Sequence, residues 1–199
     1  MLTHMAQKLS SFFITKGIID KEDREVYIYS FEVLLATLIN LLSVILLAVM
    51  TKEIIPTVLF LFGFMCIRTT AGGYHSDTHL GCFLILISSH LAFLVLLKNL
   101  SYLQYEIATI IMCLISWLLV VLFSPVEDIN KKFTKKEIVK FKLRSNVTVV
   151  IVVLISVLFV SIWGKNKYAF SIATGMCVVS LSLVAGTVKN RMRKQKNNE

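Results

Sequence analysis

The sequence predicts an all-α integral membrane protein with about six transmembrane helices and an amphipathic helix at its N-terminus. Of its 199 residues, 56% are hydrophobic and only 17% are charged, whereas about a quarter of the residues in a soluble domain are charged. The apolar residues are also gathered into long runs, and a helix needs about 20 such residues to cross a bilayer. Composition and pattern therefore agree on a polytopic membrane protein.

Six apolar runs are the expected spans, and together they predict a single membrane domain over residues 1–199. We place the spans at about 30–50, 54–67, 82–97, 104–123, 147–163 and 168–187. The run at 54–67 is the shortest and predicts a short or tilted helix. Two segments rich in lysine and arginine follow the fourth and sixth spans, a basic loop at 130–144 and a basic tail at 188–199.

The N-terminal arm, residues 1–17, predicts a helix lying on the surface of the bilayer. Its apolar residues recur at helical spacing, namely Leu2, Met5, Leu9, Phe12 and Phe13. Polar residues fill the other face, as in interfacial amphipathic helices. A second helix is expected from Lys21 through Met50, with Asp20 as its N-cap. At 1.5 Å per residue it is about 45 Å long, so its first turns protrude from the membrane.

The positive charge is distributed as expected for a membrane protein with both termini in the cytoplasm. The formal net charge is +9. With that orientation, every lysine and arginine falls on the cytoplasmic side except Lys52, Lys98, Lys165 and Lys167. This asymmetry follows the positive-inside rule. The charge therefore indicates topology, and nucleic acid is not an expected partner.

A short polar segment between the second and third spans carries the residues for chemistry. It holds His75 and Cys82, seven residues apart. A histidine that deprotonates a cysteine provides the minimum apparatus for nucleophilic catalysis by a thiolate. On a straight helix the two would lie about 10 Å apart, too far for proton transfer. Glycines at 72, 73 and 81 permit the required bend.

This segment also predicts a cavity, because irregular backbone at membrane depth must be buried in protein or line a wet cavity. We expect Cys82 beside that cavity at the N-terminal end of the third span, where the helix dipole favours a thiolate. Backbone amides around Cys82 and Phe83 are the candidate oxyanion donors. Asn40 and Ser43 in the first span are expected to make polar contacts between helices.

Other interpretations of the same residues remain open. On a helix, His75, His79 and Cys82 would line one face and could bind zinc, which gives a metal-binding membrane protein. A transporter or peptide exporter is a second alternative, although no inverted repeat is visible. Asp77 could orient His75 or stay solvated. Arg68 could belong to the site or could snorkel from the end of the second span.

The polar segment resembles the signature of the accessory gene regulator protein B family. The matching residues are Arg68, Ala71, Gly72, Gly73, His75 and Cys82. The chain length, the amphipathic arm, the multiple spans and a basic loop after Ser124-Pro125 are similar as well. One departure lies in that loop, where a proline often follows the first lysines but Phe133 stands here.

The resemblance implies a bacterial membrane cysteine endopeptidase that cleaves a small quorum-sensing pro-peptide. His75 would be the general base and Cys82 the nucleophile, with Arg68, Gly72 and Gly73 in supporting positions. The reaction would pass through an enzyme thioester, which an internal cysteine or serine of the substrate converts into a cyclic thiolactone or lactone.

The resemblance also implies the partners. The pro-peptide would carry an amphipathic leader and an acidic tail, and the enzyme would lie in the plasma membrane without a cofactor; a homodimer stays open. The basic loop either contacts anionic lipid headgroups or holds the acidic tail. The lysines considered for the tail are Lys131, Lys132, Lys135 and Lys136.

Overall fold

The computed structural model describes residues 2–74, 76, 78–126, 133–161, 164 and 166–196. Within these residues the chain is helical and contains no strand. The elements are α1 Leu2–Thr15, the 3-10 turn η1 Lys21–Asp23, α2 Arg24–Thr51, α3 Ile54–Ala71, α4 His79–Asn99, α5 Tyr102–Phe123, α6 Lys135–Ser161 and α7 Asn166–Lys196. Among the described residues, six helices are long and apolar enough to cross a membrane. The prediction of an all-α polytopic membrane protein is confirmed.

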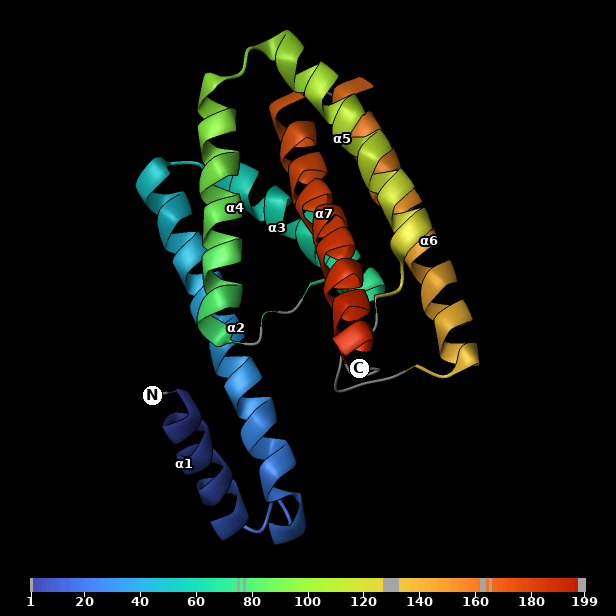
Figure 1. Ribbon diagram of the computed structural model, residues 1–199. Coiled ribbons are helices and arrows are strands. Elements are labelled where there is room, and N and C mark those ends of the chain that lie inside the picture. The colour runs from blue at the N-terminus through green and yellow to red at the C-terminus, as the bar shows by residue number, and fades with distance from the viewer. Residues whose placement is uncertain are drawn as a thin grey trace.

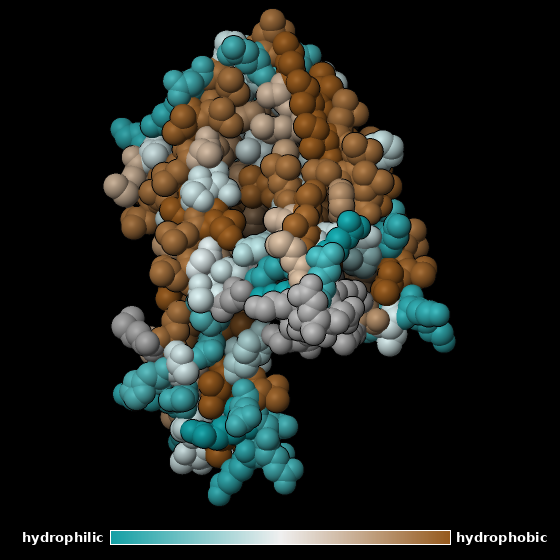
Figure 2. All heavy atoms as spheres, viewed as in Figure 1, coloured by the Kyte–Doolittle hydropathy of each residue, from teal (hydrophilic) through white to brown (hydrophobic). Residues whose placement is uncertain are grey.

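Helix α7 forms the centre of the bundle and packs against α3, α5 and α6 (Figure 1). It is the most buried of the six long helices: about two thirds of its apolar stretch is buried within the bundle, against a third or less in each of the others. The buried core around α7 includes Ile67, Val120, Val149, Met176 and Leu183. Apolar surface covers the middle of the visible face, and hydrophilic residues gather toward its two ends, as expected for a membrane-embedded bundle (Figure 2).

Two glycines bring α3 and α7 into close contact. A Cβ atom on Gly63 would lie 2.2 Å from the carbonyl oxygen of Ile172, and one on Gly175 would lie 2.0 Å from that of Phe60. Small residues that let helix backbones approach are typical of membrane-protein interfaces. The two glycines thereby fix the distance between the helices that carry much of the site described below.

Helices α2 and α4 lie together on one side of the bundle, and α2 continues well beyond it. Helix α1 folds back along this extension, as Figure 1 shows. The rings of Phe13 and Phe31 stack with centroids 5.5 Å apart. The apolar side chains of Met5 and Phe12 stay about half exposed, at 45% and 55%. Part of the amphipathic face thus packs on α2, and contact of the remainder with a bilayer stays a prediction.

Some helices are longer than the sequence predicted. Helix α6 begins at Lys135, so the segment expected to be a loop through residue 144 is helical over its last ten residues. The cause is a capping box, in which the Thr134 amide donates to the Glu137 carboxylate at 2.8 Å and the Glu137 amide donates to the Thr134 hydroxyl at 3.3 Å. Helix α7 likewise continues through the basic tail to Lys196. Asp20 lies at the N-cap position of η1, but its side chain makes no capping hydrogen bond.

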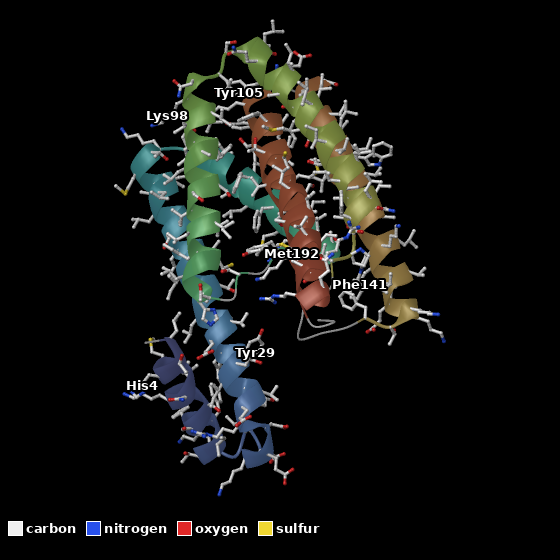
Figure 3. All side chains as sticks on the ribbon, viewed as in Figure 1. His4, Tyr29, Lys98, Tyr105, Phe141 and Met192 are labelled. Atoms are coloured by element: carbon white, nitrogen blue, oxygen red, sulfur yellow. The ribbon has the colours of Figure 1, made fainter. Side chains whose placement is uncertain are left out.

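The long helices alternate in direction, so the bundle has two distinct ends. Figure 3 shows Lys98 and Tyr105 at one end and Phe141 and Met192 at the other. We call the second the Cys82 end, because α4 begins there. His90, midway along α4, is fully buried, and its Nε2 lies 3.1 Å from the Thr57 hydroxyl of α3. This contact joins the α2–α4 side to the rest of the bundle.

Candidate active site

A cavity of about 620 Å³ opens between α2, α3, α4, α7 and the segment that joins α3 to α4. Its walls are mainly apolar, with a small number of polar side chains. The lining residues used below are Thr37, Asn40, Leu61, Phe64, Arg68, Tyr74, Ser76, Cys82, Ser89, Val178 and Ser182. The prediction of a cavity beside Cys82 is confirmed.

Cys82 lies in the first turn of α4, and its side chain is half-buried. Thr78 is the N-cap of this helix, and its hydroxyl accepts a hydrogen bond from the Gly81 amide at 3.1 Å. The Cys82 amide donates to the Thr78 carbonyl at 3.2 Å. The thiol is therefore held near the positive end of the helix dipole. The Cys82 amide is thus hydrogen-bonded within α4, and oxyanion donation by the backbone amides around Cys82 and Phe83 stays a prediction.

The two residues next to His75 in the chain, Tyr74 and Ser76, both line the cavity. His75 itself and Asp77 lie outside the described residues. Ser76 packs closely over the start of α4, since a Cβ atom on Gly81 would lie 2.1 Å from its hydroxyl oxygen. The chain just after His75 therefore runs past the turn that carries Cys82.

Arg68, near the C-terminal end of α3, contacts the backbone of the segment that precedes His75. Its Nη2 donates a hydrogen bond to the Tyr74 carbonyl at 2.8 Å, and its Nη1 lies 3.5 Å from the Gly72 carbonyl oxygen. The Tyr74 amide in turn donates to the Ser182 carbonyl of α7 at 3.0 Å. These contacts favour a structural role for Arg68 within the site over a snorkelling side chain.

The backbone conformation and the close packing at positions 72 and 73 both require glycine. Gly73 has φ +140°, and a Cβ atom on it would lie 2.3 Å from Arg68 Nη1 and 2.5 Å from the Ser182 hydroxyl. Gly72 has φ +78°, and its Cβ atom would lie 2.7 Å from the Val126 carbonyl oxygen. Any larger residue here would displace the contacts that hold the segment. No sequence pattern indicated Ser182, because it lies more than 100 residues after Gly73 in the chain.

His79 begins α4 and points toward α2, where its Nε2 lies 3.8 Å from the Glu32 carboxylate. Among the described residues, no group of three histidine, cysteine or acidic side chains could hold a metal ion. The zinc ligands that the sequence allows are His75, His79 and Cys82. Because His75 lies outside the described residues, this zinc site stays a prediction.

The polar residues of the first span differ from expectation. Ser43 donates to the Ile39 carbonyl of its own helix at 2.8 Å. Asn40 lines the cavity, and no hydrogen bond joins its side chain to any described residue. Neither makes the expected contact between helices within the described part of the chain.

The basic segment is only partly described. Lys135 and Lys136 lie in the first turn of α6 with exposed side chains. Lys131 and Lys132 fall outside the described residues. The α6 N-terminus belongs to the Cys82 end of the bundle, together with the basic C-terminal part of α7.

A comparison with protein-family models assigns the chain to a family. The family model described as Accessory gene regulator B matches residues 4–183. The chain belongs to the accessory gene regulator B family. This places a multi-pass membrane protein in the accessory gene regulator system of quorum sensing, in a family associated with the processing of quorum-sensing peptides.

Two relatives from Clostridium perfringens agree with this assignment. "Putative AgrB-like protein 2" of strain 13 is 28% identical over 158 residues, which cover 76% of this chain and 74% of the relative. "Putative AgrB-like protein" of strain SM101 is 27% identical over 136 residues, which cover 66% of this chain and 64% of the relative. No solved structure matches the chain.

Proposed function

We propose that this protein is a cysteine endopeptidase that cleaves a small quorum-sensing pro-peptide, with Cys82 as nucleophile and His75 as general base. The observation that carries the proposal is the position of Cys82 in the first turn of α4, on the wall of a large apolar cavity. Both described neighbours of His75 line the same cavity. Family membership supplies the class of substrate.

The reaction begins when His75 takes the proton of Cys82 and the thiolate attacks a peptide carbonyl carbon. The carbon–nitrogen bond then breaks, and the imidazolium gives its proton to the departing amine of the C-terminal tail. The acyl part of the substrate stays on Cys82 as a thioester. His75, neutral again, then takes the proton of an internal thiol or hydroxyl of the substrate as its sulfur or oxygen attacks the thioester carbonyl carbon. The bond from this carbon to the Cys82 sulfur breaks, the thiolate is released, and a thiolactone or lactone ring is closed.

The apolar walls suit the second half of this reaction. A thioester in bulk water is open to hydrolysis, whereas a site that excludes water protects it until the ring closes. Arg68, Gly72 and Gly73 support the reaction indirectly, because they fix the segment that leads to His75. They are positioning residues in this mechanism.

The lysines and arginines at the Cys82 end of the bundle suggest how the protein is oriented in the membrane and where the substrate binds. By the positive-inside rule, the Cys82 end faces the cytoplasm of a bacterial cell and both termini lie there. An amphipathic leader of the pro-peptide would lie in the same interface as α1, and an acidic tail would meet the lysines near the start of α6. Charge reversal in two pairs, Lys131 with Lys132 and Lys135 with Lys136, tests the last point, and unchanged turnover in both variants would refute it.

The test of the proposal is cleavage in proteoliposomes of the small pro-peptide encoded nearest this gene. Wild type is compared with Cys82→Ala and His75→Ala, and mass spectrometry follows the released tail. We expect tail release by wild type alone. If both variants released the tail as fast as wild type, Cys82 and His75 would not be the catalytic residues. An exporter without protease activity would move the intact peptide across the bilayer and would retain this transport with Cys82→Ala.

A further inference from the structure

We infer that the cavity receives the acyl part of the peptide, the residues before the cleaved bond, and that Asn40 on α2 binds a backbone carbonyl of that part. The inference rests on the proposed function and adds to it a binding residue and the chemical class of the peptide segment that enters the bundle. That segment has apolar side chains.

The first step concerns the depth of the cavity. Ser89 follows Cys82 by seven residues on α4 and also lines the cavity, so the cavity runs about 10 Å along the helix beyond the thiol. Leu61 lies seven residues before Arg68 on α3, and both residues line it. About two helical turns of wall thus lie deeper in the bundle than Cys82. This length accommodates about three residues of extended peptide at roughly 3.3 Å each.

The second step concerns which part of the peptide occupies this space. After cleavage the tail must leave, whereas the acyl part stays bonded to the Cys82 sulfur. The wall beyond Cys82 is formed mainly by apolar side chains such as Leu61, Phe64 and Val178. A charged group at such a wall loses its hydration and gains no ion pair or hydrogen bond in return. The acyl part with apolar side chains therefore fits the deep space, and a charged tail belongs outside it.

The third step concerns hydrogen bonds. Peptide carbonyls in an apolar cavity need donors, because an unpaired one loses its hydration. The Thr37 hydroxyl already donates to the Val33 carbonyl at 2.8 Å, and the Ser89 hydroxyl donates to the Ile85 carbonyl at 2.7 Å. The Ser182 hydroxyl donates to the Val179 carbonyl at 2.7 Å. These three hydroxyls can only accept further bonds.

Asn40 differs from them. Asn40 lines the cavity, and its amide, which carries two N–H donors, is bonded to no described residue. A polar side chain inside a membrane that faces a cavity indicates a functional contact. The hydroxyls of Tyr74 and Ser76 also line the cavity, but they belong to the segment between α3 and α4, at the Cys82 end. Among the neutral side chains that the helices contribute to the wall beyond Cys82, Asn40 has donors available to a peptide carbonyl.

The test uses reagents that alkylate Cys82 and requires no knowledge of the natural peptide. In a peptidyl chloromethyl ketone, the thiolate displaces chloride to form a thioether, and the peptide occupies the position of the acyl part. The reagents are acetyl-Leu-Phe chloromethyl ketone, acetyl-Asp-Asp chloromethyl ketone and iodoacetamide, which has no peptide chain. Alkylation of Cys82 in the purified full-length protein is followed by peptide mapping and mass spectrometry.

The variants are Asn40→Leu, which removes the donors at similar size, Asn40→Gln, which keeps an amide, and Ser43→Leu, on the same helix but away from the described cavity wall. We expect the Leu-Phe reagent to alkylate wild type at least tenfold faster than the Asp-Asp reagent. Asn40→Leu should slow the Leu-Phe reagent about tenfold, the effect of one lost hydrogen bond. Its rate with iodoacetamide should not change. Asn40→Gln should recover part of the loss, and Ser43→Leu should behave as wild type.

Any of three results would overturn the inference. Equal rates for the two peptidyl reagents would refute an apolar acyl segment. With Asn40→Leu, an unchanged rate for the Leu-Phe reagent, or equal slowing of it and iodoacetamide, would refute the hydrogen bond from Asn40. Failure of the proposed function is distinguishable, because wild type and Cys82→Ala would then release the same amount of tail, or none, whatever the alkylation rates show.

Discussion

Substitution of Gly73 by alanine tests how the segment before His75 is held. The new Cβ atom would lie 2.3 Å from Arg68 Nη1 and 2.5 Å from the Ser182 hydroxyl. Arg68 cannot move aside freely, because its guanidinium is hydrogen-bonded to the Tyr74 carbonyl at 2.8 Å. Loss of such a charge-assisted bond costs about 1.5–3 kcal/mol. Alanine at φ +140° adds strain of about 1–3 kcal/mol.

The strain is relieved if the segment moves away from α7, which leaves the helices folded. A penalty of about 3 kcal/mol against the native position lowers its population about a hundredfold. We therefore expect pro-peptide cleavage by Gly73→Ala to fall about a hundredfold, with little change in the thermal unfolding of the bundle. The assay is tail release in proteoliposomes, beside a melting curve of the same preparation.

Two further variants separate the causes. Gly17 also has a positive φ, +68°, but a Cβ atom there would meet no atom within 4 Å. Gly17→Ala should therefore keep nearly full activity. Ser182→Ala removes one of the two clashing atoms, so combining it with Gly73→Ala should restore part of the lost cleavage. Full activity of Gly73→Ala alone would refute the argument that these contacts position the site.

Three other predictions follow from helix ends and packing. Thr78→Val removes the hydroxyl that caps α4 at the Gly81 amide; we expect about 1 kcal/mol lower stability of this first turn and faster hydrogen exchange there than in wild type. Gly63→Ala puts a Cβ atom 2.2 Å from the Ile172 carbonyl oxygen and should destabilise the bundle by about 1–3 kcal/mol in a denaturation series. Glu137→Ala breaks the capping box of α6, and circular dichroism should show a small loss of helix; an unchanged spectrum would contradict the cap.

The fold could be predicted largely from the sequence because apolar runs report directly on membrane spans. Each predicted run lies within or almost entirely within one of the helices α2 to α7. The helix ends were less predictable, since charged helical turns outside a membrane resemble loops in hydropathy. The sequence does contain a signal for the start of α6 within the expected loop, because Thr134 and Glu137 have the spacing of a capping box.

The candidate site was predicted in part. The place of Cys82 at a helix start beside a cavity followed from the glycines and the polar segment, which are local in the sequence. The contribution of α7 was not predictable, because the contact of Ser182 with Tyr74 joins residues far apart in the chain. Asn40 lines the cavity, whereas its position in an apolar span predicts a contact between helices. Hydropathy does not distinguish a helix face on a cavity from one on a neighbouring helix.

The central claim is that Cys82 becomes acylated by its substrate. The direct measurement is the mass of the protein after brief incubation of proteoliposomes with the pro-peptide encoded nearest its gene and quenching in acid. We predict an adduct equal to the acyl part of the peptide, mapped to Cys82, released by hydroxylamine and absent from Cys82→Ala. Cleavage of the pro-peptide at an undiminished rate by Cys82→Ala, with no adduct on Cys82 of the wild type, would contradict the account.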